Sequence, residues 1–299
     1  MKSTLFSMSA MLVSAAVLIS SCGGSSEKAS DQNAGDEFDA AKSQIASDLE
    51  NVLKVMPPPS EVPYLLEGAG ADYNATLINP IENLNNYTGD QNTAALNLGV
   101  YATDIAYLTS YKKTDLALDY MGECQKLAAP VGVASAVDYG IVARFERNME
   151  NRDSLAMIIN QVIEESGDRL SELDELNSAA LLLTGSWIEG IYLSTTIVDT
   201  YPDDLPEEAR TLVLKPLVKI VMDQKRSLYD LIKILAEVPS TESTASVSAD
   251  IAKVKAIYDG ELMEVERQIR ENTGDFVLLP SVLDNLAAEV TRIRASIVN

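Results

Sequence analysis

The spacing of the apolar residues restricts the fold of this chain more than any other feature. From residue 36 onward they recur about every 3.6 residues, a period that indicates α-helices with one apolar face. The first such stripe is formed by Phe38, Ile45, Leu49, Val52 and Leu53. No stretch alternates β-branched and polar residues for long enough to predict a strand. The low aromatic fraction of 6% also fits long helices better than sheets. The pattern therefore predicts an all-α fold.

Turn residues and prolines divide this helical pattern into segments. Three prolines at 57–59 end the first helix. The Pro-, Gly- and Asn-rich residues 60–90 predict a long connection with one short helix near 81–87. Short loops between helices favour an antiparallel multi-helix bundle of about eight to ten helices, formed by residues 41–299. Residues 240–248, rich in Ser and Thr, are predicted to be a mobile loop. The later helices are predicted at residues 91–111, 114–128, 134–149, 152–166, 168–201, 205–238, 247–272 and 279–297.

The N-terminus has the form of an export signal. Lys2 gives a short basic start, residues 5–19 are mostly apolar, and two serines directly precede Cys22. An apolar run of roughly 15 residues is too short for a stable membrane span. A cysteine after two small residues resembles the lipobox of bacterial lipoproteins, in which the thiol receives a diacylglycerol before cleavage. We therefore expect residues 1–21 to be a lipoprotein signal peptide and Cys22 to carry a lipid.

The residues that follow Cys22 predict a flexible tether over 22–40. Residues 23–35 are dominated by Gly, Ser, Ala, Asp and Asn, a composition that does not form a packed core. Two or three acyl chains would hold the protein stably on a membrane, where a single chain would not. Gly23, rather than Asp, after the cysteine resembles the sorting signal for the outer membrane. We expect a lipid-anchored protein of the cell envelope, in the outer membrane.

Composition excludes several classes of function. The chain has 23 basic and 45 acidic residues, a formal net charge of −22, so its surface repels phosphate backbones and nucleic-acid binding is not expected. Histidine is absent, which excludes an imidazole base, a His-activated nucleophile and zinc sites with nitrogen ligands. No metal or cofactor is predicted. Cys124, left alone once Cys22 is acylated, is predicted to be a small buried hydrophobic residue.

Two stretches of the chain resemble each other at an offset of 85 residues, Leu96–Ser110 and Leu181–Thr195. Asp104 aligns with Glu189, and each is the only charged residue in its surroundings. Helical spacing places both carboxylates on or beside an apolar face. A carboxylate in such a position must be hydrogen-bonded or have a raised pKa.

Two interpretations of this pair remain open. In the structural one, two central helices cross at their glycines, and the acids accept hydrogen bonds from tyrosines or helix ends. In the functional one, the acids share a proton or bind a ligand or cation across a cleft lined by Tyr101, Tyr107, Trp187 and Tyr192. Carboxylate pairs also serve glycoside hydrolysis, so the alternative function is a carboxylate-dependent envelope hydrolase or lyase using Asp104 and Glu189. A pocket lined by both acids and Trp187 would favour a ligand site or an enzyme.

The stretches Leu98–Tyr107 and Gly185–Tyr192, behind a lipobox, resemble an all-helical lipoprotein family of Bacteroidota. The resemblance covers most of residues 40–299. It implies a fold class and an envelope location and carries no catalytic residue. We therefore expect a helical domain that binds a partner protein or a small ligand. A tetratricopeptide adaptor would show a period of about 34 residues, which the sequence lacks.

Overall fold

The computed structural model describes residues 58–202, 204, 206–271 and 280–299, together with a few positions between 40 and 56. The chain divides into two compact units, residues 1–42 and 43–299. Nearly all of the described residues lie in the second unit. The predicted signal peptide, Cys22 and nearly all of the predicted tether lie outside the described residues, so these remain predictions.

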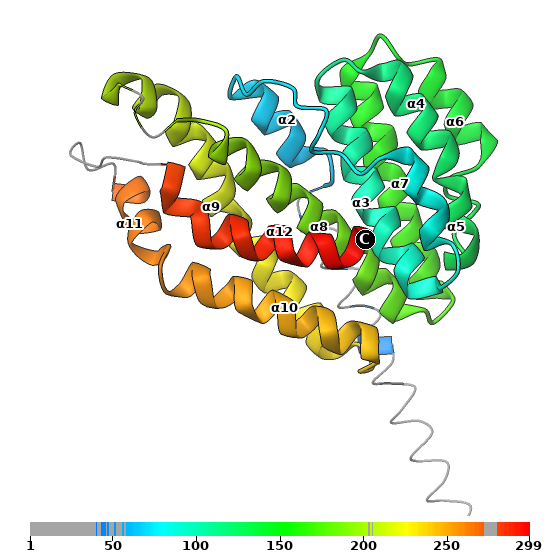
Figure 1. Ribbon diagram of the computed structural model, residues 1–299. Helices are drawn as coiled ribbons and strands as arrows, with labels where there is room; N and C mark the ends of the chain where they lie inside the picture. Colours follow the sequence, from blue (N-terminus) through cyan, green and yellow to red (C-terminus); the bar gives the residue numbers. More distant parts are fainter. Residues whose placement is uncertain are drawn as a thin grey trace, which may run out of the picture. The chain divides into compact units, whose positions relative to one another are not determined.

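Within the described ranges the second unit consists of helices and contains no strand (Figure 1). This confirms the predicted all-α, multi-helix bundle. The α-helices are α2 (Glu61–Gly68), α3 (Gln91–Ser110), α4 (Thr114–Glu123), α5 (Gln125–Val131), α6 (Tyr139–Glu146), α7 (Arg152–Glu172), α8 (Leu176–Asp199), α9 (Glu207–Glu237), α10 (Glu242–Asp259), α11 (Met263–Glu271) and α12 (Asp284–Val298). Two 3-10 helices, η1 (Ile81–Tyr87) and η2 (Pro280–Leu283), complete the set.

Two predicted boundaries are wrong for local reasons. Residues 240–248, predicted to be a mobile loop, mostly belong to α10, because Thr241 and Thr244 form a capping box in which each side chain accepts a hydrogen bond from the other's backbone N–H. The break between two helices that the sequence predicts near Gly167 lies instead after the end of α7 at Glu172. There Asp174 adopts a left-handed conformation with φ 62°, which a short polar side chain tolerates. Gly167 is buried inside α7.

Other segments differ from their predicted lengths. The helix predicted over 114–128 is divided at Cys124, and the helix predicted over 247–272 is divided at Gly260. The predicted connection over 60–90 contains α2, whose eight residues are too few to give a clear period. The short helix predicted near 81–87 is confirmed as η1. The described residues therefore hold more helices than the sequence predicts.

The centre of the bundle is the crossing of α3 and α8 (Figure 1). A Cβ atom at Gly99 would lie 2.1 Å from the carbonyl oxygen of Leu182, and one at Gly185 would lie 1.9 Å from that of Leu96. Only glycine allows two backbones to approach this closely. The helices therefore cross at their glycines, as the structural interpretation of the sequence expects.

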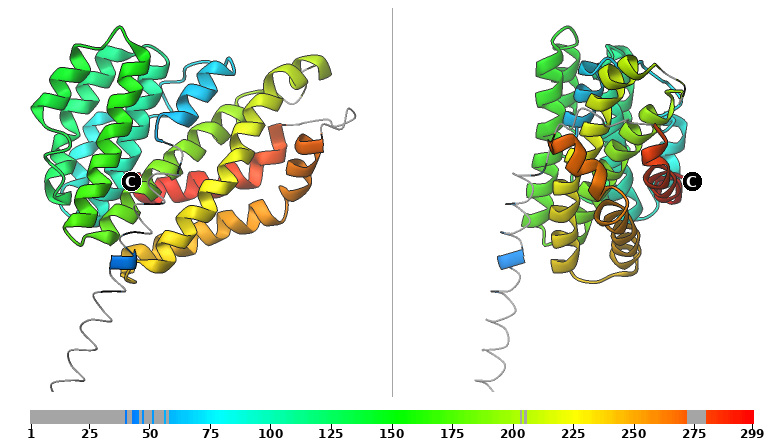
Figure 2. Two further views of the ribbon diagram at one scale, coloured as in Figure 1. Left: turned by 180° about the vertical axis from the view of Figure 1, so that it is seen from behind. Right: turned by 90° about the vertical axis from the view of Figure 1, so that its left-hand side faces the viewer.

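The remaining helices cover the two sides of this crossing. α3 packs against α4, α5 and α7, whereas α8 packs against α9 and α12, and α10 packs against α9 and α12 (Figure 2). In the part of the chain that the structure describes, α8 is the one helix long and apolar enough to span a membrane. Most of its residues are buried by neighbouring helices, so it is the core helix of this bundle.

Candidate functional site

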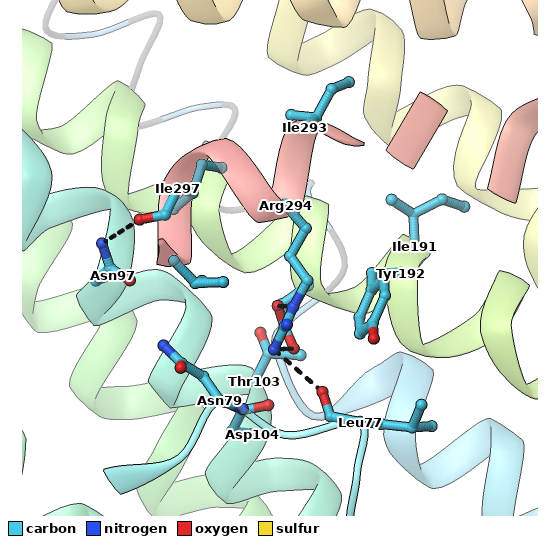
Figure 3. Close-up of polar contacts among 12 residues, drawn as sticks. Leu77, Asn79, Asn97, Thr103, Asp104, Ile191, Tyr192, Ile293, Arg294 and Ile297 are labelled. Carbon is cyan, nitrogen blue, oxygen red and sulfur yellow. Dashed lines mark hydrogen bonds and ion pairs between the residues drawn. The ribbon is translucent and has the colours of Figure 1, made fainter. Parts of the chain in front are cut away.

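Glu189 is bound by an arginine from the far end of the chain. Arg294 of α12 donates from Nε to Oε2 of Glu189 at 2.8 Å and from Nη2 to Oε1 at 2.9 Å (Figure 3). Nη2 also donates to the carbonyl oxygen of Leu77 at 3.1 Å. The guanidinium lies 4.3 Å from the ring centroid of Tyr192, a cation–π contact. A two-pronged pair of this kind holds both partners in one orientation.

The position of Arg294 follows from how α12 is packed. Its buried apolar residues are Leu286, Val290, Ile293, Ile297 and Val298. All but Val298 form a stripe at helical spacing, and Arg294 lies on the same face. The last carbonyls of a helix lack partners within it. Here Asn97 Nδ2 donates to the carbonyl of Ile297 at 3.1 Å, and the hydroxyl of Tyr87 donates to that of Val298 at 2.7 Å. Both ends of these bonds are buried, so the end of α12 is fixed.

Asp104 is held by the loop that precedes η1. The backbone N–H of Asn79 donates to Oδ2 of Asp104 at 3.0 Å. The carbonyl of Asn79 accepts from the hydroxyl of Tyr120 at 2.9 Å, and the carbonyl of Pro80 accepts from Tyr101 at 2.8 Å. The side-chain amide of Asn79 donates to the hydroxyl of Tyr87 at 3.2 Å. Tyrosine hydroxyls thus donate hydrogen bonds to the backbone carbonyls of this buried loop, and the loop in turn donates one hydrogen bond to the carboxyl group of Asp104.

The two buried acids lie close enough to influence each other's protonation. Oδ1 of Asp104 is buried and has no hydrogen-bond partner in the described ranges. An ionised carboxylate in that position would be costly, so burial favours the protonated form. Burial and the neighbouring charge of Glu189 raise the pKa of Asp104 well above its ordinary value. Burial also raises the pKa of Glu189, but Arg294 opposes that effect. A neutral Asp104 beside the Glu189–Arg294 ion pair leaves the cluster without net charge.

The structure brings together four of the six predicted site residues. Asp104 and Glu189 meet, Tyr192 joins them beneath Arg294, and Tyr101 lies beside them through Pro80. Tyr107 lies farther along α3, where its hydroxyl accepts from the backbone of Asn74 at 2.9 Å and its ring stacks on Tyr73 at 5.5 Å. The acids are held by Arg294 and a backbone N–H, and not by the tyrosines that the structural interpretation proposed.

Trp187, the sixth predicted residue, is on another side of α8. It lines a cavity of about 250 Å³ between α2, α7, α8 and α9, and neither acid lines that cavity. Its indole Nε1 is buried and has no hydrogen-bond partner in the described part of the chain. The structure therefore separates Trp187 from the two acids, and the cavity that Trp187 lines contains neither of them.

Sequence reasoning missed Asn79 and Arg294. Arg294 lies four residues after Val290 and three before Ile297, so helical spacing alone places a lone cation on the buried face of the last helix. Asn79 comes between Ile78 and Pro80, and a residue before proline is biased toward extended backbone. Neither signal says which acid is the partner, because that depends on tertiary packing.

The chemistry of this acid cluster is limited by its burial. Neither carboxylate has exposed surface, so no substrate reaches them in this conformation. Cys124 is a free, buried thiol in the apolar core, as predicted, and burial raises its pKa. Within the described ranges no group of three or more His, Cys, Asp or Glu side chains is placed to hold a metal ion.

In comparisons with known proteins, the chain matches no family model, no curated protein and no solved structure. The resemblance to an all-helical lipoprotein family of Bacteroidota therefore remains a prediction from two short stretches and the lipobox.

Proposed function

We propose that this chain is a lipid-anchored protein of the cell envelope, in the outer membrane, whose helical domain binds a small ligand or a partner protein and carries out no reaction. The anchor is supported by the residues around Cys22, which combine a basic start, an apolar run, two serines and a cysteine. The Gly- and Ser-rich residues that follow would separate the domain from the membrane. The net charge of −22 would keep such a domain soluble at an anionic surface.

The observation that favours binding over catalysis is the closure of the acid cluster. A general acid or base must come within hydrogen-bonding distance of the atom it serves. Asp104 and Glu189 have no exposed surface, and Arg294 already occupies both oxygens of Glu189. A hydrolase that used this pair would have to expel α12 first. The cluster is better explained as a support for the bundle.

The anchor is tested by replacing each cysteine with serine in the full chain. Cys22→Ser removes the only thiol at the proposed acylation site, so the protein should leave the membrane fraction. Cys124→Ser makes the same chemical change inside the core and should leave partitioning unchanged. Mass spectrometry of the N-terminal peptide should show a diacylglycerol on Cys22. Membrane partitioning that survives Cys22→Ser, or a different mature N-terminus, would contradict the anchor.

A further inference from the structure

The hairpin formed by α9 and α10 has a groove between its two helices. The helices pack against each other (Figure 2), and the groove has a volume of about 490 Å³. That volume lies within the range of roughly 300–1,000 Å³ usual for small-molecule sites. Its floor is made by Leu235, Val238 and Ile251, all of them buried. The groove therefore offers a small molecule an apolar surface.

Small residues on the rim keep this floor accessible. Ala236 of α9 and Ala245 and Ala252 of α10 line the groove and are exposed. Long side chains at exposed helix positions can lie over neighbouring apolar surface and cover it. An alanine side chain ends at Cβ and cannot do so. The chain therefore leaves the floor of the groove open to a ligand.

One end of the groove carries a cation. Lys255 is the only charged residue that lines the groove in the described part of the chain. Its ammonium is paired with Asp259 at 2.5 Å and lies 5.0 Å from the ring centroid of Tyr229. Asp259 also pairs with Lys225 at 3.4 Å, and Lys225 pairs with Glu266 at 2.9 Å. Two lysines and two acids thus meet at this end, and the lysine is the one that reaches the groove.

The opposite end, at the connection between the two helices, is more acidic. Glu237 is near the end of α9, where Lys233 pairs with it at 3.7 Å, and the exposed Glu242 begins α10. No charged residue of the described ranges lines the groove between the two ends. An anionic group is therefore favoured beside Lys255 and disfavoured at the connection, whereas an apolar chain is favoured between them.

We propose that this groove binds the anion of a free fatty acid, with the tail on the apolar floor and the carboxylate on Lys255. An ammonium has three donors, and Asp259 accepts from one of them, so a second carboxylate can share it. Lys255 follows Thr244, at the far end of the groove, by about three helical turns, or about 16 Å. An extended acyl chain of about twelve to fourteen carbons has this length. The proposal rests on the proposed function only in treating the domain as a binding domain.

The test compares three amphiphiles by calorimetry below their micellar concentrations: dodecanoate, dodecyltrimethylammonium and hexanoate. The full-length Cys22→Ser chain is used, because it carries no lipid of its own at that position. It is measured in buffer, or in nanodiscs with the signal of empty nanodiscs subtracted if it stays membrane-bound. Hexanoate should bind at least about 100-fold more weakly than dodecanoate, because each buried methylene contributes roughly a factor of four.

The head group gives the sharper comparison. Dodecyltrimethylammonium has the same tail and should bind about 3- to 10-fold more weakly than dodecanoate, because Lys255 repels it. Non-specific association would give the opposite order, since the chain's net charge of −22 attracts cations. Equal affinities, a preference for the cationic amphiphile, or no binding of dodecanoate would overturn the proposal.

Two variants with matched controls locate the contacts. Ala252→Leu fills the groove and should weaken dodecanoate at least about tenfold, whereas Ala249→Leu, exposed on the same helix but not lining the groove, should have no effect. Lys255→Met should weaken dodecanoate about 2- to 5-fold and should not weaken dodecyltrimethylammonium. Lys253→Met removes an exposed lysine that does not line the groove and should change neither affinity.

Circular dichroism checks that each variant is folded, and Ala252→Leu still tests the groove if Lys255→Met does not fold. A folded Ala252→Leu chain that binds dodecanoate as its parent does would refute the assignment, as would equal effects of the two lysine changes. Membrane partitioning that survives Cys22→Ser contradicts the anchor alone, and failed dodecanoate binding contradicts the groove alone.

Discussion

Replacing Arg294 with methionine tests the central claim about the acid cluster. Methionine keeps an unbranched side chain of similar length but removes the charge. The change leaves Glu189 buried without its cation and removes three hydrogen bonds, two to Glu189 and one to Leu77. We therefore expect a large loss of stability with no change in the helical fold class.

The size of this loss follows from the burial of the pair. The Arg294 side chain is 12% exposed and that of Glu189 is 0% exposed. Removing one partner of such a pair costs about 3–5 kcal/mol of unfolding free energy. For a domain of this size each kcal/mol lowers Tm by roughly 2–4 °C, so Tm should fall by roughly 6–20 °C. Without its cation, Glu189 should have a folded-state pKa further above its ordinary value. The folded state would then bind more protons than the unfolded one, so the loss should grow as the pH rises above about 4.5.

Urea denaturation followed by circular dichroism at several pH values measures this effect. Arg292→Met is the matched control on the same helix: the Arg292 side chain is 46% exposed, and its ion pairs with Asp250 and Glu289 lie near the surface. That control should lose only about 0–1 kcal/mol. Adding Glu189→Gln to Arg294→Met should recover part of the loss. If Arg294→Met costs no more than Arg292→Met, or costs the same at acid and neutral pH, the buried ion pair does not hold α12.

Two further predictions concern the same helices. Because the folded-state pKa of Asp104 is raised above its ordinary value of 3.8, the stability of the native chain should fall as the pH rises above that value. Asp104→Asn should lose this part of the slope in denaturation curves between about pH 4 and 8, and identical slopes would contradict the raised pKa of Asp104. Gly99→Ala places a Cβ 2.1 Å from the backbone oxygen of Leu182 and should cost about 3 kcal/mol or more by calorimetry, whereas Gly122→Ala meets nothing within 4 Å and should be neutral or stabilise by up to about 1 kcal/mol. Equal shifts in Tm would show that the crossing tolerates a methyl group.

The fold class could be predicted because it depends on short-range patterns. Apolar residues at helical spacing mark the long helices α3 and α9 to within a few residues of their ends. Where a helix ends is decided by single residues whose role depends on context. Asp174 ends α7 by adopting a left-handed backbone, and Thr241 starts α10 in a Ser- and Thr-rich segment that resembles a loop.

The candidate site could be predicted in part. Asp104 and Glu189 stand out because each is a lone charge in an apolar helix, and the structure brings them into contact. The functional interpretation of the sequence places Trp187, two residues before Glu189, in the same cleft as the two acids. In a helix, however, residues two apart point to different sides, and Trp187 lines a separate cavity.

The amino-acid sequence by itself determined that the chain forms helices, since helical periodicity is a local property, whereas the crossing of two helices at glycines was one of two interpretations that the sequence left open. Tertiary structure alone decided which cation satisfies Glu189. Arg294 is 105 residues away along the chain, and the pair forms only because α12 packs on α8. Charge pairing over such a separation leaves no pattern in the sequence, because any of the chain's 23 basic residues satisfies the same electrostatic need.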